Sequence, residues 1–171
     1  DKAPSSFSSR IGAEKVLAEQ IGSPFNYMKQ MRLYVAKTMP EPNDIEFEEA
    51  LEKQIQHFVT QSSGRAFVLF TSYRLMQRIA GRMTPFFSGQ GWPLLVQGSG
   101  KPRATLVEMF KKDISSVLFG TDSFWTGVDV PGEALSNVIV TRLPFAVPDH
   151  PLVESRLEQI RERNGNPLMG Y

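Results

Sequence analysis

The chain has 171 residues, a length that suits one domain with a sizeable hydrophobic core. Hydrophobic residues make up 41% of it and charged residues 22%, the net charge is +1, and cysteine is absent. These values exclude a disulfide framework and a thiolate metal site or iron–sulfur cluster in this chain, and they give no strongly basic footprint for nucleic acid. No run of residues approaches the roughly 18 apolar residues of a membrane span, and no signal-peptide pattern opens the chain.

The first 43 residues are predicted to be a polar lead and a joining segment. They include an amphipathic helix around residues 12–22 and a strand at Met31–Ala36, where the side chains alternate. A turn-rich stretch follows, and Asn43 or Asp44 is expected to cap a helix that ends at Gly64. The apolar residues of that helix recur at helical spacing: Ile45, Leu51, Ile55, Phe58 and Val59.

From residue 66 onward, short apolar runs alternate with amphipathic helices. The predicted strands are residues 66–70, 94–96, 116–120 and 138–140. Helices are expected to begin at Thr71–Ser72, at Ser99–Lys101 and at Pro148 or Asp149. A continuous apolar run such as 66–70 is typical of a strand buried on both faces. The alternation therefore indicates an α/β fold with a mostly parallel sheet, in which ligands bind beyond the carboxyl ends of the strands.

The first strand exit with chemical potential is Thr71–Ser72–Tyr73. Hydroxyls and free N–H groups at the start of a helix are natural phosphate ligands, and a tyrosine ring can stack on a base. The simpler interpretation is that Thr71 and Ser72 only cap the helix.

The second strand exit, Gln97–Lys101, has the glycines and lysine of a phosphate loop but not its pattern. Pro102 stands where serine or threonine should follow Lys101, so we do not interpret the segment as a Walker A motif. It is predicted to be a strand-to-helix turn in which Ser99 caps the helix.

The third strand exit, residues 120–132, is the most informative segment. Its three glycines allow the backbone to approach a ligand closely, and Thr121 and Ser123 offer hydroxyls to a nucleic-acid backbone. Asp129 can orient a ribose hydroxyl, or an arginine that contacts nucleotide phosphates. Phe124 is predicted to be a structural anchor, whereas Trp125 is equally compatible with an anchor and with a ligand contact.

The remaining polar candidates are weaker. Arg142 follows the last predicted strand and is interpreted as an exposed cation. His57 and His150 lie far apart in sequence and have no second ligand at helical spacing, so no metal site is predicted.

The segment G-T-x-S-F-W-x-G-V-D-x-P-G at residues 120–132 resembles motif V of the DinG/XPD branch of superfamily 2 helicases. Residues 137–140 and 143–145, with Pro148, Pro151 and Arg156, continue the resemblance downstream. Residues 67–73 resemble motif IV, and residues 23–27 and 33–35 resemble the stretch that joins the two motor domains. The similarity thus covers nearly the whole chain. Thr126 departs from the family, in which an acidic residue is common, so this chain lacks that carboxylate.

This resemblance implies a RecA-like, P-loop NTPase-like α/β domain without a P-loop, the second motor domain of an ATP-dependent DNA helicase. Residues 1–171 would be one fragment, with a lead at 1–43 and a core at 44–171, that ends before motif VI. ATP and Mg would be bound mainly by the missing first motor domain, which is also the expected partner. The isolated chain is therefore expected to have no ATPase activity.

The resemblance also assigns candidate roles to individual residues. Gly127 and Asp129 are candidates for the nucleotide side, and the candidates for contact with single-stranded DNA are Thr71, Ser72, Tyr73, Thr121, Ser123 and Trp125. Movement would be 5′ to 3′, in a bacterial, nucleoid-associated cytoplasmic protein without a membrane partner. Two alternatives are a RecA-like binding module without motor activity and a small-molecule enzyme on a doubly wound sheet. The latter lacks a nucleophile–base pair and a dinucleotide fingerprint.

Overall fold

The computed structural model describes residues 21–130, 132–144 and 151–162. Contacts divide the chain into two compact units, residues 1–38 and 39–171, and each is described by itself. In the described part of the first unit, helix α2 (Tyr27–Gln30) is capped by Asn26, whose side chain accepts a hydrogen bond from the Lys29 N–H. Most of the helix predicted at 12–22 falls outside the described residues, and residues 21 and 22 are not helical.

The strand predicted at Met31–Ala36 is wrong. These residues are irregular and exposed, with Leu33 at 80% and Val35 at 69% exposure. A strand needs a hydrogen-bonded neighbour, and no described segment pairs with residues 31–36. Alternation of side chains along residues 31–36 is therefore not sufficient to predict a strand.

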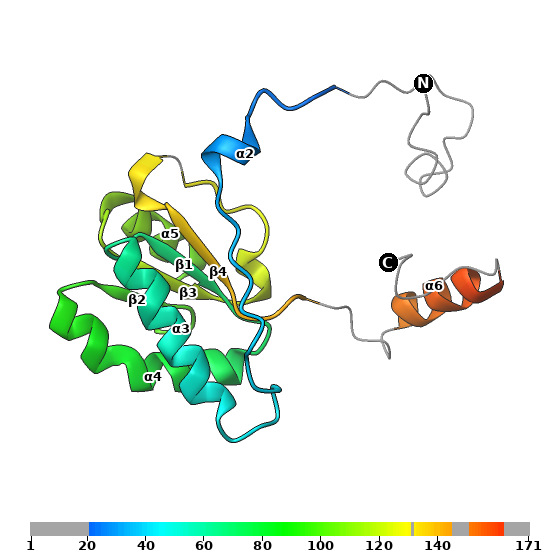
Figure 1. The fold of residues 1–171 in the computed structure, drawn as a ribbon, viewed down its shortest axis with the longest axis horizontal. Helices are drawn as coiled ribbons and strands as arrows, with labels where there is room; N and C mark the ends of the chain where they lie inside the picture. Colours follow the sequence, from blue (N-terminus) through cyan, green and yellow to red (C-terminus); the bar gives the residue numbers. More distant parts are fainter. Residues whose placement is uncertain (1–20, 131, 145–150, 163–171) are drawn as a thin grey trace. The chain divides into compact units, whose positions relative to one another are not determined.

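The second unit is built on a four-stranded sheet in the order β2-β3-β1-β4, with every neighbouring pair parallel (Figure 1). The strands are β1 (Ala66–Leu69), β2 (Leu94–Val96), β3 (Val117–Gly120) and β4 (Asn137–Val140). The helices are α3 (Phe47–Gln61), α4 (Tyr73–Gln90), α5 (Arg103–Lys112) and α6 (Pro151–Glu162). Two short 3₁₀ turns, η1 (Asp122–Phe124) and η2 (Gly132–Ala134), lie between β3 and β4. The predicted α/β class with a parallel sheet is confirmed.

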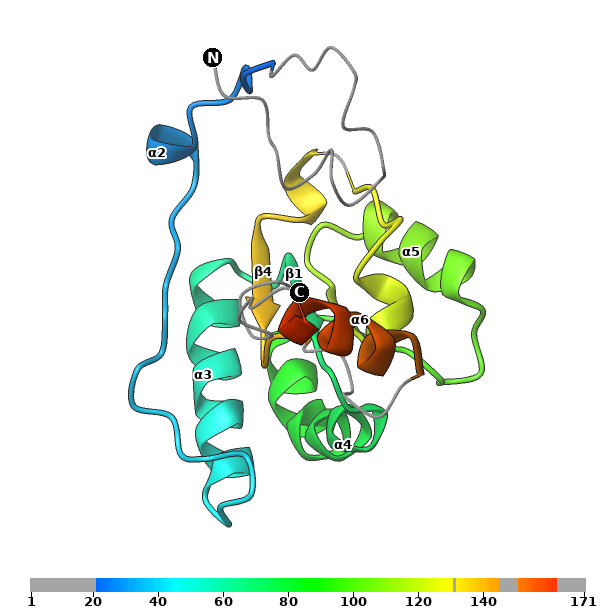
Figure 2. The same cartoon turned by 90° about the vertical axis from the view of Figure 1, so that its right-hand side faces the viewer.

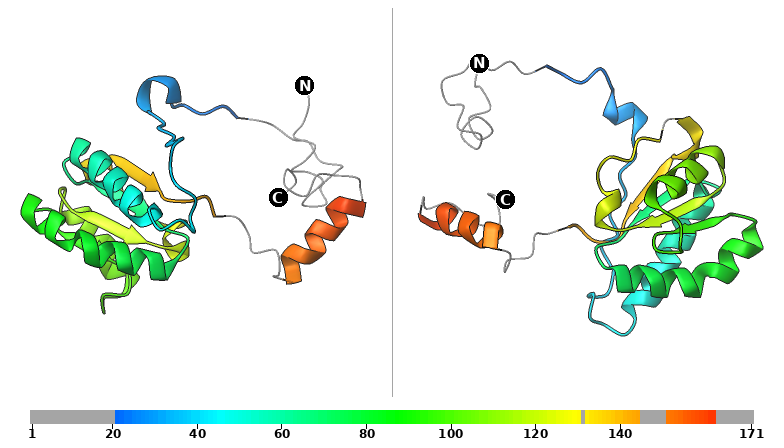
Figure 3. Two further views of the ribbon diagram at one scale, coloured as in Figure 1. Left: turned by 60° about the horizontal axis from the view of Figure 1, so that its bottom comes forward. Right: turned by 180° about the vertical axis from the view of Figure 1, so that it is seen from behind.

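The strand order explains which helix covers which face. From β1 the chain passes β3 to reach β2 at the edge, and then it returns to β3 and crosses β1 to β4. Because parallel crossovers are right-handed, connections that run in opposite directions lie on opposite faces. Helices α3 and α4 accordingly cover one face, whereas α5 and the β3–β4 connection cover the other (Figures 1, 2 and 3).

Each face has its own core, because β1 and β3 bury their side chains on both sides. The α3/α4 face packs residues of those helices on alternate strand residues, among them Ile55, Val59, Val68, Phe70, Phe87 and Phe119. The α5 face packs Phe67, Leu69, Leu95, Leu106, Phe110, Leu118 and Phe124.

Two predicted helix starts are corrected. Helix α3 begins at Phe47 after Glu46, without a side-chain cap, because the Asp44 carboxylate accepts from the Glu41 N–H (2.9 Å) in the preceding turn. Ile45, predicted to face the core, is 97% exposed. Helix α5 begins after Pro102 rather than at a capping Ser99. A residue before a proline disfavours helical geometry, and Pro102 itself is the extended N-cap, with φ −59° and ψ 150°.

The other boundaries agree better with expectation. Helix α3 stops before Gly64, which has a φ of +81°; an added Cβ there would lie 1.9 Å from the Ser115 carbonyl oxygen. Glycine is therefore required at the turn into β1. The start predicted for the last helix at residues 148–149 lies outside the described residues, and α6 is helical from Pro151.

Ion pairs join α3 to α4 at the surface. Glu48 accepts from Arg78 Nε (2.9 Å), and Glu52 lies 2.6 Å from Arg82 Nε without hydrogen-bond geometry. Burial raises the pKa of Glu52 above its ordinary value, and the nearby Arg82 offsets this only in part. Because the side chains of Arg78 and Arg82 are 48% and 50% exposed, these ion pairs add little stability.

Candidate functional site

The exits of β1, β2 and β3 meet at one edge of the sheet. Leu69 is in register with Gly120, and Val96 is in register with Phe119, so the three strands end side by side. The chain leaves β1 toward the α3/α4 face and leaves β3 toward the α5 face. Such divergence between neighbouring parallel strands is the usual position of a ligand site. We call residues 71–73, 97–98 and 121–125 the strand-exit surface.

At the exit of β1, the capping interpretation is confirmed for Ser72. Its hydroxyl oxygen accepts from the Leu75 N–H (3.3 Å) at the start of α4. As the acceptor in that bond, the hydroxyl keeps its own hydrogen for a second partner. Tyr73 is 49% exposed, and Thr71 is half-buried. This exit therefore combines a free hydroxyl hydrogen with an accessible aromatic ring.

At the exit of β2, the Gln97 side chain connects to the exit of β3. Its Oε1 accepts from the Thr121 N–H (2.7 Å) and from the Thr121 hydroxyl (3.0 Å). Its Nε2 donates to the Ser123 hydroxyl oxygen (3.2 Å). Thr121 is buried, and its hydroxyl is used inside the protein, whereas Ser123 is exposed and keeps its hydrogen free.

The aromatic residues of the β3–β4 connection hold it onto the α5 face. Phe124 is 2% exposed, and its ring meets that of Phe67 edge to face with centroids 5.9 Å apart. Trp125 is half-buried, and its Nε1 donates to the Phe70 carbonyl at the end of β1 (3.4 Å). The anchor interpretation of Phe124 is confirmed, and Trp125 also serves as a link between two exits.

Beyond Trp125 the connection alternates between inward and outward residues. Val128 and Val130 pack against the α5-face core, whereas Gly127 and Asp129 are exposed. Gly127 has a φ of +67°, a conformation that favours glycine. The two candidates for nucleotide contact therefore point away from the core.

Arg103, at the start of α5, braces the same connection. Its Nη2 donates to the Thr126 carbonyl (2.9 Å), and its guanidinium lies 5.3 Å from the centroid of the Phe124 ring. This pairing of a cation with an aromatic face adds to the hydrogen bond. The turn between Phe124 and Gly127 is thus held from both ends.

The structure brings together the residues predicted to bind DNA, because Thr71, Ser72 and Tyr73 follow β1 while Thr121, Ser123 and Trp125 follow the adjacent β3. Gly127 and Asp129 lie further along the connection. Sequence reasoning missed Gln97, Gly98 and Arg103. The rule that ligands gather at strand exits could have singled out Gln97, but the segment was interpreted as a strand-to-helix turn.

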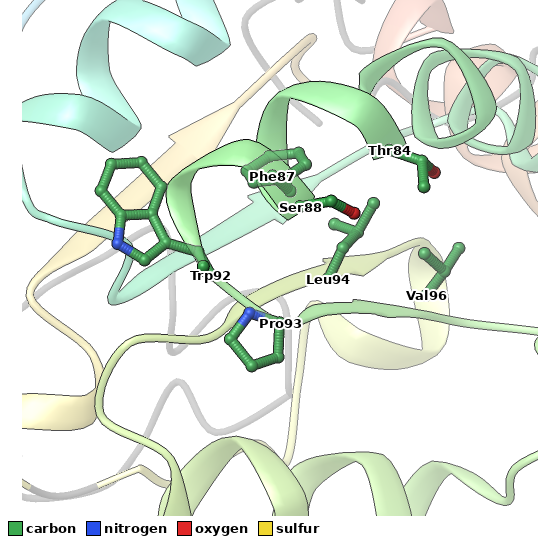
Figure 4. A pocket seen from close by; sticks show the side chains of 8 residues that line it. Thr84, Phe87, Ser88, Trp92, Pro93, Leu94 and Val96 are labelled. Atoms are coloured by element: carbon green, nitrogen blue, oxygen red, sulfur yellow. The ribbon is translucent and has the colours of Figure 1, made fainter.

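A hollow in the described residues lies apart from this surface. It has a volume of about 530 Å³ and lies beside β2 and the end of α4 (Figure 4). Its lining comprises Thr84, Phe87, Ser88, Gly91, Trp92, Pro93, Leu94 and Val96. Within the described residues, no group of three or more acidic, histidine or cysteine side chains could hold a metal ion. No helix in this part of the chain is long and apolar enough to cross a membrane.

The chain is similar to known proteins over most of its length. The family model described as a helicase C-terminal domain matches residues 55–171. An ATP-dependent DNA helicase YoaA of Haemophilus influenzae is 38% identical over 162 residues, which is 95% of this chain and 25% of the relative. An ATP-dependent DNA helicase DinG of Photobacterium profundum is 36% identical over 152 residues, covering 87% and 22%.

A third relative carries a different activity in its name. The 3′-5′ exonuclease DinG of Bacillus subtilis is 34% identical over 153 residues, which is 87% of this chain and 16% of the relative. The chain therefore spans a quarter or less of the length of these relatives. The family match and the similarity over most of the chain show that it belongs to the helicase C-terminal domain family, as the form of that domain present in DinG-type helicases.

Proposed function

We propose that this chain is the second motor domain of an ATP-dependent DNA helicase and works with a first motor domain of the same protein. The observation that carries the proposal is that the 120–132 segment, with its motif, leaves the sheet beside the exit of β1. Such neighbouring exits favour ligand binding. The relatives named as ATP-dependent DNA helicases support the same activity.

Single-stranded DNA is the proposed ligand of the strand-exit surface. The exposed hydroxyls of Ser72 and Ser123 each keep a hydrogen that can be donated to a phosphate oxygen. The exposed ring of Tyr73 offers a face on which a base can stack. Thr71 and Trp125 are half-buried at the two exits, where they shape the surface. These contacts do not require a strongly basic domain, because stacking and neutral hydrogen bonds carry them.

The nucleotide is proposed to bind at an interdomain cleft, with Gly127 and Asp129 as this chain's contributions. Both are exposed, and the inward packing of Val128 and Val130 keeps them so. As the family resemblance implies, Mg and most of the ATP contacts are proposed to belong to the first motor domain. Asp129 would orient a ribose hydroxyl or an arginine, and thereby position charge near the phosphates. The family resemblance further supports the proposal of ATP-driven movement along single strands, in the 5′ to 3′ direction in a bacterial cytoplasm.

The test is Asp129→Ala in the full-length protein. Loss of the carboxylate should reduce DNA-stimulated ATPase activity by about tenfold or more, because positioning of charge dominates phosphoryl transfer. Glu133→Ala removes another exposed acid from the same connection and should leave the rate unchanged. An unchanged rate in Asp129→Ala would remove Asp129 from the nucleotide side. Absence of DNA-stimulated ATPase activity in the unaltered full-length protein would instead favour a binding module without motor activity.

A further inference from the structure

We propose that Gln97 and Gly98 are positioning residues that hold the DNA-facing groups of the exits of β1 and β3 in one fixed arrangement. This inference rests on the proposed function, since it concerns the same strand-exit surface. Neither residue belongs to the segments that resemble helicase motifs; they come from the turn after β2.

The hydrogen bonds of Gln97 fix the orientation of its side-chain amide. The Thr121 N–H can only donate, so the atom 2.7 Å away must be the amide oxygen. The amide nitrogen is then directed to the Ser123 hydroxyl oxygen (3.2 Å). Ser123 therefore acts as an acceptor toward Gln97 and presents its hydrogen to a ligand. The Gln97 side chain thus fixes the path of the chain after β3, and it also makes the exposed Ser123 hydroxyl an acceptor toward Gln97 and a donor toward a ligand.

The backbone of Gln97 is itself held from two elements. Its N–H donates to the Phe119 carbonyl in β3 (3.0 Å), and its carbonyl accepts from the Gln77 side chain in α4 (2.8 Å). Because main chain and side chain are both engaged, the residue has little freedom to rearrange. Pre-organisation of this kind reduces the entropy lost when a ligand binds.

Gly98 makes room for the tip of Tyr73. An added Cβ at Gly98 would lie 1.8 Å from the Tyr73 hydroxyl oxygen and 2.8 Å from the ring carbon that carries it. The Tyr73 side chain therefore lies against the backbone of the β2 exit, although the residue is 49% exposed. This contact between the Tyr73 hydroxyl end and the Gly98 backbone keeps the exposed face of the Tyr73 ring in one orientation. A side chain at position 98 would push the ring away.

Gly100 provides a matched control within the same turn. Gly98 and Gly100 both have a φ of +84°, but an added Cβ at Gly100 would meet nothing within 4 Å. Gly98→Ala and Gly100→Ala therefore introduce the same backbone strain, and only the former collides with Tyr73. Any difference between the two variants reports the contact with the ring and not the turn.

The first experiment measures the affinity of the full-length protein for a fluorescent single-stranded oligonucleotide by anisotropy. Tyr73→Ala should weaken binding about tenfold, the order expected for the loss of one stacked base. Gly98→Ala should weaken it similarly, and the double variant Gly98→Ala, Tyr73→Ala should be no weaker than Tyr73→Ala alone. Gly100→Ala should stay within about twofold of the unchanged protein.

The outcomes separate the inference from the proposed function. Unchanged affinity in Tyr73→Ala would contradict the DNA-binding role of the surface. A loss in Tyr73→Ala together with equal behaviour of Gly98→Ala and Gly100→Ala would overturn the role of Gly98 alone.

The second experiment uses Gln97→Leu and Gln97→Glu in the same assay, at low and high salt. The leucine variant loses every side-chain hydrogen bond and should bind about tenfold more weakly at both salt concentrations. Glutamate keeps the two bonds accepted from Thr121 but adds a negative charge. It should bind weakly at low salt and recover only in part at high salt. Screening relieves its repulsion of phosphates, but its second oxygen would accept the Ser123 hydrogen that the glutamine leaves to the ligand.

Two results would overturn the role of Gln97. One is a leucine variant that binds as the unchanged protein does. The other is a glutamate variant that stays as weak as the leucine variant at high salt, since the accepted hydrogen bonds would then not be what positions the exit. The glutamate variant and the glycine pair keep the proposal testable if the leucine variant does not fold.

Discussion

The two faces of the sheet are covered in different ways. On one face, α3 and α4 lie over all of the strands, and Ile139 of the edge strand β4 packs against their core. On the other face the only described helix is α5, and the β3–β4 connection completes the cover with Phe124, Val128, Val130 and Leu135. On that face Val138 and Val140 of β4 stay 53% and 43% exposed.

This difference shows that the β3–β4 connection, which contains the helicase-like segment 120–132, both covers the sheet and forms part of the candidate site. Its inward residues replace a second helix, whereas its outward residues, among them Ser123, Gly127 and Asp129, form the candidate site. Substitutions of the inward residues of this connection should therefore lower stability, whereas substitutions of the outward residues should affect ligand binding. The edge at β4, in contrast, should tolerate change on its exposed side.

The largest expected effect is that of Phe124→Ala. Removing this buried ring should lower the free energy of unfolding by about 3–5 kcal/mol, from the lost burial and the cavity left behind. Phe87→Ala on the α3/α4 face should cost about the same, because the two rings are 2% and 1% exposed. Equilibrium urea unfolding measures both. A loss below about 1 kcal/mol for Phe124→Ala would mean that the connection does not act as a cover.

A smaller effect is expected for Asn137→Ala at the start of β4. The Asn137 amide donates to the Phe58 carbonyl (2.9 Å) and to the Ser62 hydroxyl (3.1 Å), which ties the edge strand to the end of α3. Its removal should cost about 1–2 kcal/mol in urea unfolding, because a half-buried carbonyl loses a partner. Ser136→Ala, at the exposed neighbour, is the control. Equal stability of the two variants would show that β4 does not depend on this tie.

The smallest effect is expected for Val138→Thr on the exposed side of β4. Threonine also suits a strand, and its hydroxyl would reach water, so the free energy of unfolding should change by less than about 0.5 kcal/mol. The same change at Val68, which is fully buried in β1, should cost about 1–3 kcal/mol because the hydroxyl would lose its contact with water. The midpoints of urea unfolding compare the pair. A large loss at Val138 would show that this side is covered after all.

Local patterns predicted the elements whose environment follows from their own residues. The apolar run at 66–70 is typical of a strand buried on both faces, as β1 is. Ser72 caps α4 through a bond to a residue three positions away. The same patterns failed for residues 31–36. Alternation says which side chains could share a face, but not whether a neighbouring strand exists.

By itself the sequence determined the class of fold, the order of its elements and the segments that leave the sheet, because each depends on side chains close together in the chain. The tertiary structure alone decided that β3 lies between β1 and β2. That order brings Gln97 to Thr121, 24 positions away, and Gly98 to Tyr73. It also turned Thr121 inward and left Ser123 exposed, since a hydrogen bond between distant segments depends on strand order, which no local pattern encodes.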